Sequence, residues 1–242
     1  MTALPHFDAA AISAVVDMDS AIKALKEAFK DLGKLHPRTQ VSLGTTDDLL
    51  LMPAVTSMGI GIKTVTVISD NPGKGLPLIH AHYLLCDRDT GRPQATFDGS
   101  ALTALRTPAA SGVATEMLAP PEVNSLGIFG TGVQAQGHIA AMLSARSSIE
   151  TIFVSGRTLE STTNFVETAN SQGRKILAAT PEQAAECDVI CGCTSATTPV
   201  IPTESVRNGA HINLVGSYSA ARREVDTCLL YTSPSPRDRT RS

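Results

Sequence analysis

A short glycine-rich segment carries the clearest chemical pattern in the sequence. Residues 130–135 read Gly-Thr-Gly-Val-Gln-Ala, directly after the apolar run 126–129 and directly before a stretch with helical character. Gly130 permits a tight turn, Gly132 lets the backbone approach a pyrophosphate, and the small Ala135 allows a helix to pack closely on a strand. Phosphates would then lie at the helix N-terminus. The segment predicts a dinucleotide site; a plain strand-to-helix turn is the alternative.

The end of the next expected strand bears on which nucleotide binds. An NAD site usually carries an acidic residue there, which bonds the ribose hydroxyls. Here the strand 151–154 is followed by Ser-Gly-Arg-Thr, without a carboxylate. Arg157 and the hydroxyl of Ser155 or Thr158 could hold a 2′-phosphate through charge-assisted hydrogen bonds, so we expect NADP(H) to be favoured over NAD(H). Alternatively, Arg157 is a solvated loop residue. The residues expected to bind the cofactor are Gly130, Thr131, Gly132, Val133, Gln134, Ser155, Arg157 and Thr158.

Three cations in the first half of the chain are candidates for binding an anion. On the strand expected at 60–69, alternation of side chains puts Lys63 on the same face as Val65 and Val67. A lysine on an apolar face needs an anionic partner or a route to solvent. Arg106 ends a helical segment just before a Thr-Pro pair, and Arg38 lies in a loop that enters a strand. Spacing alone does not show that the three converge, and each also fits an ordinary surface charge.

The histidines and cysteines give weaker signals. His80 and His82 share one face of an expected strand but have no third ligand nearby, so we expect them to line a pocket or the surface and expect no metal. Cys187, Cys191 and Cys193 match neither a zinc knuckle nor a redox pair. We expect these three, like Cys86, to be small buried residues of a chain in a reducing compartment.

Composition places the chain among ordinary globular proteins. It has 242 residues, 42% of them apolar and 18% charged, with a formal net charge of −3. That charge gives no electrostatic reason to expect nucleic acid or an anionic membrane as a partner. No apolar run is long enough to span a membrane, and the N-terminus lacks the basic and apolar segments of a signal peptide. We therefore expect a cytoplasmic protein.

Two kinds of element pattern follow one another, with a boundary at Ala119-Pro120-Pro121. Before it, the sequence predicts a helix over 17–33, capped by Asp17 or Asp19 and ended by Gly33. A hairpin of 40–43 with 49–52 follows, then strands at 60–69, 76–86 and 94–97, with an irregular loop at 70–75. The last element is a helix from Ser100 to Leu118 that Pro108 breaks or kinks. After it, strands at 126–129, 151–154, 175–178, 189–193 and 211–215 alternate with helices from 133 and over 159–170. Such alternation is typical of parallel strands joined by crossover helices.

Several segments together resemble the ornithine cyclodeaminase and mu-crystallin family. They are Leu51-Met52-Pro53, Gly61-Ile62-Lys63, Asp98-Gly99, the Leu-Thr-Ala-Leu-Arg-Thr of 102–107, the glycine segment 130–135, and 154–158. The resemblance runs from about Pro37 to Asp226. It implies an α/β fold: an α+β substrate-binding and dimerisation domain at 1–119, and at 120–227 a Rossmann domain whose doubly wound parallel sheet is incomplete at its C-terminal end.

The resemblance also implies roles for the three cations. Arg38, Lys63 and Arg106 correspond to the residues that hold the carboxylate of a small amino-acid or imino-acid substrate beside the nicotinamide. The resemblance also implies that the full-length protein is a homodimer. Lys63 would bind the carboxylate and is a candidate proton donor. Tyr218 is a second candidate donor, although it also fits an ordinary loop tyrosine.

Two departures from the family pattern distinguish between reactions. Leu50 stands where ornithine cyclodeaminases carry a glutamate, and Gly216-Ser217-Tyr218 stands where they carry an aspartate after a Gly-Gly pair. Cyclodeamination needs carboxylates to take protons from the amines. Imine reduction needs a hydride from the cofactor, cations that orient the substrate and one proton donor. We therefore expect an oxidoreductase that converts delta-1-pyrroline-2-carboxylate or its six-membered homologue to proline or pipecolate. Ornithine cyclodeaminase, alanine dehydrogenase and a non-catalytic NADPH-binding crystallin-like protein are the alternatives.

The last residues of the chain differ in character from the rest. The segment 228–242 has the composition of a disordered basic tail, and it also resembles the translation of a sequencing adapter. Because the family pattern holds as far as Asp226, we expect about 227 native residues of a longer chain.

Overall fold

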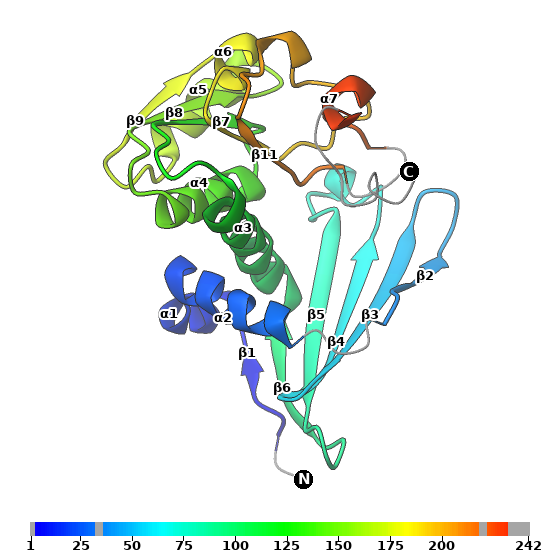
Figure 1. Ribbon diagram of the computed structural model, residues 1–242. Helices are drawn as coiled ribbons and strands as arrows, with labels where there is room; N and C mark the ends of the chain where they lie inside the picture. Colours follow the sequence, from blue (N-terminus) through cyan, green and yellow to red (C-terminus); the bar gives the residue numbers. More distant parts are fainter. Residues whose placement is uncertain (1–2, 32–35, 218–221, 232–242) are drawn as a thin grey trace, which may run out of the picture. The chain divides into compact units, whose positions relative to one another are not determined.

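The structure, a computed structural model, describes residues 3–31, 36–217 and 222–231. It divides into two compact units, residues 1–106 and 107–242. The division falls within the long helix α3 (Gly99–Leu118), and the boundary predicted at 119–121 lies just beyond the end of that helix. Each unit is built on its own sheet, shown in Figure 1.

The first unit contains a six-stranded sheet in the order β1-β6-β5-β4-β3-β2. The strands are β1 (His6–Phe7), β2 (Thr39–Ser42), β3 (Asp48–Thr56), β4 (Gly59–Val67), β5 (Ile79–Cys86) and β6 (Pro93–Asp98). Strands β2 to β6 pair antiparallel, and the short β1 joins β6 in parallel. The twisted ribbon of β3, β4 and β5 is drawn in blue and cyan in Figure 1. The predicted hairpin and the three predicted strands that follow it are confirmed.

Two helices, α1 (Ala9–Val15) and α2 (Met18–Lys30), precede the hairpin. The Asp17 carboxylate accepts a hydrogen bond of 2.9 Å from the Ser20 amide, so Asp17 is the N-cap of α2 as predicted. At the other end, the Asp31 carboxylate accepts a hydrogen bond of 2.5 Å from the Ser57 hydroxyl. This contact ties α2 to the turn between β3 and β4. Gly33, the predicted end of the helix, lies outside the described residues.

Two local expectations are wrong, and one of the two alternatives for Pro108, a break in the helix, is excluded. The loop expected to be irregular contains a 3-10 helix, η1 (Pro72–Lys74). Asp98, not Ser100, caps α3, because its carboxylate accepts hydrogen bonds from the backbone amides of Ser100 (2.8 Å) and Ala101 (3.0 Å). Pro108 does not break α3, which continues to Leu118. A proline removes only one helical donor, and burial of Pro108 and Ala109 favours the continuous helix.

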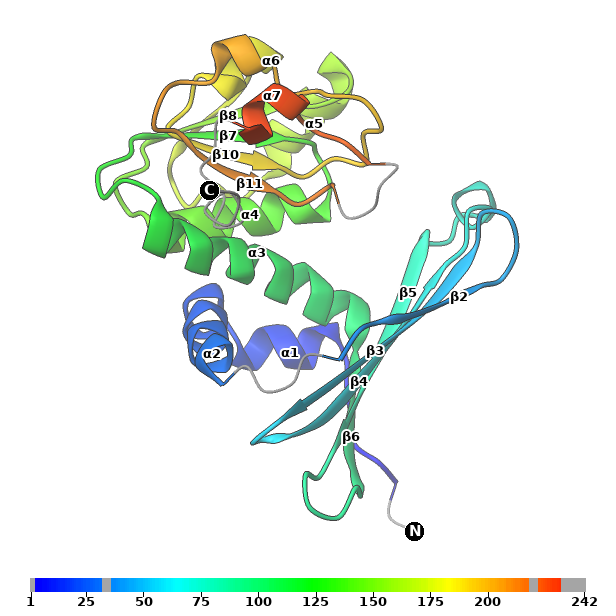
Figure 2. The ribbon, with the colours of Figure 1, turned by 45° about the vertical axis from the view of Figure 1, so that its right-hand side comes forward.

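The second unit contains a parallel sheet in the order β11-β10-β7-β8-β9. Its elements are β7 (Ser125–Phe129), α4 (Val133–Ala145), β8 (Thr151–Ser155), α5 (Leu159–Thr168), β9 (Lys175–Ala178), α6 (Pro181–Ala185), β10 (Val189–Gly192), η2 (Thr203–Ser205), β11 (His211–Leu214) and α7 (Thr227–Tyr231). Helix α4 lies on one face of the sheet and α6 on the other (Figure 2). The predicted doubly wound parallel sheet is confirmed.

Strand order in this sheet reverses between β7 and β10. The chain moves outward from β7 to β9 and then returns to place β10 on the other side of β7. In open parallel sheets, the carboxyl ends of strands at such a reversal border the usual ligand-binding crevice. The glycine segment begins at the carboxyl end of β7 and therefore lies at this position.

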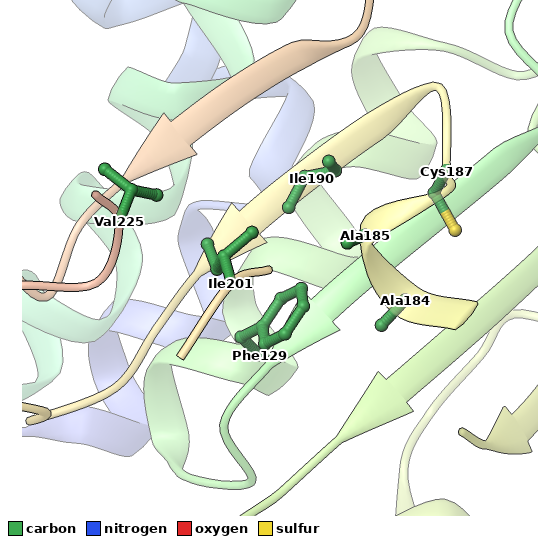
Figure 3. Close-up of a cluster of buried hydrophobic side chains, with 7 residues drawn as sticks. All are labelled: Phe129, Ala184, Ala185, Cys187, Ile190, Ile201 and Val225. Carbon is green, nitrogen blue, oxygen red and sulfur yellow. The ribbon is translucent and has the colours of Figure 1, made fainter. Parts of the chain in front are cut away.

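A dry core fixes α6 on the sheet. Figure 3 shows its side chains: Phe129, Ala184, Ala185, Cys187, Ile190, Ile201 and Val225. The close approach requires Gly127, because a Cβ at this position would overlap the carbonyl oxygen of Ala184. Cys86, Cys187 and Cys191 are buried free thiols and Cys193 is partly buried, so the expectation of small buried cysteines is confirmed.

A buried carboxylate that the sequence patterns did not identify joins the ends of β10 and β11. Glu224 is fully buried and accepts three hydrogen bonds of 2.8 Å, from the amide and the hydroxyl of Thr194 and from the amide of Gly216. Glycines at 192 and 216 leave space for it, since a Cβ at either would lie within 2.7 Å of the carboxylate. Glu224 thus holds the two loops that follow β10 and β11 in one arrangement.

Candidate nucleotide-binding and carboxylate-binding sites

The turn after β7 accepts only glycine at its first position. Gly130 has a φ of +108°, and a Cβ there would lie 2.6 Å from the carbonyl oxygen of Cys193. The Gly130 amide donates a hydrogen bond of 2.9 Å to the carbonyl of Ser155. The turn therefore lies against both neighbouring strand ends, those of β8 and β10.

Gly132 leaves open space at the start of α4. It is the N-cap of this helix, makes no side-chain cap, and a Cβ built on it would have no atom within 4 Å. The first-turn amides of α4 consequently have no capping side chain, and a helix N-terminus of this kind attracts phosphate. Ala135 is fully buried, which allows the close packing that the motif requires. These residues fit a dinucleotide pyrophosphate.

The loop after β8 presents one cation. Arg157 is exposed and has no acidic partner within the part of the chain that the structure describes. The Thr158 hydroxyl already accepts a hydrogen bond of 3.1 Å from the Ser161 amide and caps α5. Ser155 is 7% exposed. Of the three residues predicted to contact a 2′-phosphate, Arg157 is therefore the one that is exposed and not engaged in capping a helix.

A second candidate site lies in the first unit, where the charges of two cations interact. Lys63 is in the middle of β4, and burial together with the charge of Arg106 lowers its pKa to about 8. Arg106, on α3, keeps contact with solvent, while partial desolvation lowers its pKa as well. Neither makes an ion pair with any described carboxylate. Two interacting cations without an anionic partner are candidates for binding an external carboxylate.

The register of the sheet relates the third predicted cation to this pair. Met52 of β3 lies opposite Lys63 of β4, and Thr39 of β2 lies opposite Leu51. Carrying the β2 register back by one residue would place Arg38 opposite Met52. Arg38, Met52 and Lys63 would then follow one another across a single face of the sheet. The structure shows an electrostatic interaction between Lys63 and Arg106, whereas Arg38 is exposed and immediately precedes β2.

The remaining predicted residues are distributed as follows. Leu50 pairs with Val65 and shares the face of Lys63, whereas the exposed His80 and His82 pair with Thr66 and Thr64 on the opposite face. Tyr218 lies outside the described residues. Within those residues, no group of three or more His, Cys, Asp or Glu side chains could hold a metal, and no helix is long and apolar enough to cross a membrane.

One neighbour of Lys63 has no signal in the sequence. Tyr83 of β5 pairs directly with Lys63 and is half-buried. Only the register between β4 and β5 reveals it, because no motif or spacing connects the two residues along the chain.

Comparison with protein families and curated sequences gives consistent matches. The model of the ornithine cyclodeaminase/mu-crystallin family matches residues 7–234. An alanine dehydrogenase of Archaeoglobus fulgidus is 32% identical over 222 residues, which cover 90% of this chain and 69% of that protein. A Delta(1)-pyrroline-2-carboxylate reductase of Bacillus cereus is 38% identical over 181 residues, or 73% of this chain and 55% of that protein. The chain thus spans between about half and two thirds of these relatives.

Solved structures show the same relationship. Delta(1)-pyrroline-2-carboxylate reductase of Thermococcus litoralis, solved with NADH and L-proline, matches with a TM-score of 0.89 at 31% identity over 95% of this chain and 74% of that chain. An archaeal alanine dehydrogenase dimer with bound NAD matches with a TM-score of 0.88 at 28% identity, over 95% of this chain and 72% of that chain.

Proposed function

Because the chain belongs to the ornithine cyclodeaminase/mu-crystallin family, we propose that it is an NAD(P)H-dependent reductase of a cyclic imino acid. The substrate is delta-1-pyrroline-2-carboxylate or delta-1-piperideine-2-carboxylate, and the product is proline or pipecolate. The observation that carries the proposal is the pair of Lys63 and Arg106, two partly buried cations whose charges interact and which have no described acidic partner. Relatives named as pyrroline-2-carboxylate reductases support it.

The proposed reaction needs a hydride, a bound and oriented substrate, and a proton donor. A nicotinamide cofactor held by the glycine turn at 130–135 would supply the hydride for the carbon of the C=N bond. Lys63 and Arg106 bind the carboxylate and so orient the ring. Because the pKa of Lys63 is about 8, its ammonium group can give a proton to the imine nitrogen near neutral pH. Lys63 is therefore both a carboxylate ligand and the proposed proton donor.

The face that carries Lys63 favours reduction over cyclodeamination. Leu50 shares that face and is apolar, so it can take no proton from an amine. Lys63 and Arg106 contribute positive charge near Leu50, whereas Asp48, the acidic residue of β3 on that face, pairs with Val67 at the end of β4. Alanine dehydrogenase is the second candidate, because the relative from Archaeoglobus fulgidus matches over 90% of this chain. Its reaction also requires a carboxylate site and a nicotinamide.

We propose further that NADP(H) is preferred over NAD(H) and that the full-length protein is a homodimer. Exposed Arg157 and the absence of a carboxylate at the end of β8 support the first point. Both solved relatives named above hold NAD or NADH, which makes Arg157 the residue to test. The dimeric archaeal alanine dehydrogenase supports the second point.

The decisive experiment measures oxidation of NADPH and of NADH by the purified protein with each substrate class. Delta-1-pyrroline-2-carboxylate and its six-membered homologue are compared with pyruvate plus ammonium, and ammonia release is measured with ornithine. We expect oxidation with a cyclic imine. Oxidation only with pyruvate plus ammonium would assign an alanine dehydrogenase, and ammonia from ornithine would assign a cyclodeaminase. Tight NADPH binding without any turnover would identify a binding protein.

A further inference from the structure

We propose that Tyr83 is a further substrate-binding residue, whose hydroxyl donates a hydrogen bond to the carboxylate held by Lys63 and Arg106. This inference rests on the proposed carboxylate site and adds a third donor to it. Neither the glycine motif nor the cation pattern involves Tyr83.

The first observation is the position of Tyr83 on the sheet. It lies directly opposite Lys63 in the antiparallel pair of β5 and β4. Side chains of directly paired residues are on the same face, with Cβ atoms roughly 4.5–5.5 Å apart. The end of the tyrosine ring covers Gly61, because a Cβ on that glycine would overlap the Tyr83 hydroxyl. Lys63 and the phenol thus occupy neighbouring positions on one face.

The Tyr83 ring contacts one aromatic residue, which in turn stacks on another. Tyr83 packs edge-on against Phe97, with ring centroids 6.1 Å apart and an interplanar angle of 72°. Phe97 stacks in turn on Phe7, at 5.1 Å and 19°. These contacts restrict the ring, so that the position of its hydroxyl is set before any ligand binds.

The second observation concerns hydrogen bonding. Among the described residues, the Tyr83 hydroxyl has no hydrogen-bond partner. Burial raises the pKa of this phenol, so it keeps its proton at neutral pH and is available as a donor. A phenylalanine would fill the same space without desolvating a hydroxyl. The Tyr83 hydroxyl is therefore a donor without a described acceptor, beside two cations without a described anionic partner.

A ligand that suits these three side chains has several hydrogen-bond acceptor atoms and a negative charge. Lys63, Arg106 and Tyr83 offer N–H and O–H donors, and no described acidic residue pairs with either cation. A carboxylate has two oxygens and about four acceptor positions, so it can accept from all three groups at once. The imino-acid carboxylate of the proposed reaction meets this requirement.

The test compares two variants that displace the hydroxyl in different ways. Tyr83→Phe removes only the oxygen atom. Gly61→Ala leaves Tyr83 intact but introduces a Cβ where the hydroxyl lies, which forces the ring to move. His82→Ala is the matched control, because this exposed neighbour is on the opposite face of β5. For each protein we would measure KM and kcat with the cyclic imine, thermal stability, and L-proline binding by calorimetry with NADH present.

We expect Tyr83→Phe to raise KM and the Kd for L-proline at least about tenfold, the loss typical of a hydrogen bond to a charged group. Its kcat and melting temperature should change little. Gly61→Ala should move KM in the same direction, and His82→Ala should leave it unchanged.

The failures of the two proposals can be told apart. A Tyr83→Phe enzyme whose KM and L-proline affinity stay within about twofold of the wild type overturns the role of Tyr83 alone. If the wild type oxidises no nicotinamide with cyclic imines but does so with pyruvate and ammonium, the proposed substrate is wrong, and the same variants then test Tyr83 with pyruvate. If the wild type binds neither carboxylate, the site and the role of Tyr83 are both wrong.

Discussion

Arg106 lies close enough to Lys63 that its charge helps lower the pKa of Lys63 to about 8. Both side chains are partly desolvated, and their like charges are not compensated by any described carboxylate. Such an arrangement disfavours the protonated lysine in the unliganded protein. A bound carboxylate relieves the repulsion, which is a physical reason to connect this pair with ligand binding rather than with folding.

The affinity for a carboxylate ligand should depend on pH through Lys63. The ammonium form binds the carboxylate, so the affinity for L-proline should fall as pH rises through about 8. In Arg106→Gln the repulsion is removed, the pKa of Lys63 increases, and the fall should move to higher pH although overall binding is weaker. Calorimetric titration at a series of pH values measures both midpoints. An unchanged midpoint in the variant would show that Arg106 does not act on Lys63.

Lys63→Met should stabilise the protein while abolishing carboxylate binding. The pKa of Lys63 is lowered on folding, from 10.5 to about 8, so the unfolded state binds more protons between these values and stability rises with pH across that window. A neutral side chain removes the penalty at neutral pH. We expect Tm to increase by about 2–4 °C. The control is Lys74→Met, an exposed lysine in η1 that should not alter Tm. A decrease in Tm for Lys63→Met would contradict the prediction.

Alanine substitutions of the two glycines in the nucleotide turn should have different effects, one on stability and the other on NADPH binding. Gly130→Ala introduces a side chain at a φ of +108° and 2.6 Å from a carbonyl oxygen, so it should reduce the free energy of unfolding by about 1–3 kcal/mol or more. Gly132→Ala meets no atom within 4 Å and should keep the stability of the wild type. It should nevertheless lose NADPH binding, because the methyl group occupies the space left for the pyrophosphate. Urea unfolding and fluorescence titration separate the two effects.

Arg157→Ala should change nucleotide preference. We expect the Kd for NADPH to increase about tenfold or more, and the Kd for NADH to change by less than about twofold, because only NADPH has a 2′-phosphate to lose a charge-assisted contact. Arg92→Ala, in an exposed turn of the first unit, is the control for a change in net charge. If the ratio of the Kd for NADPH to the Kd for NADH stays the same in Arg157→Ala, Arg157 does not bind the 2′-phosphate.

Local features of the fold were predictable because their causes lie within a few residues of one another. Asp17 caps its helix through an amide three residues away, and Gly130 turns the chain directly after a strand. Alternation along β4 places Lys63 with Val65 whatever the rest of the chain does. Local preference misled where packing opposed it, as at Pro108, which stays inside a continuous helix.

The sequence by itself determined the α/β class, the parallel sheet, the glycine turn and the cations that could bind an anion. Only the tertiary structure decided which of these groups meet. The proximity of Arg106 to Lys63, the place of Tyr83 beside Lys63, and the three hydrogen bonds of Glu224 all join residues distant in the chain. Such contacts depend on strand register and helix packing, and these are settled by the burial of many side chains together rather than by any local pattern.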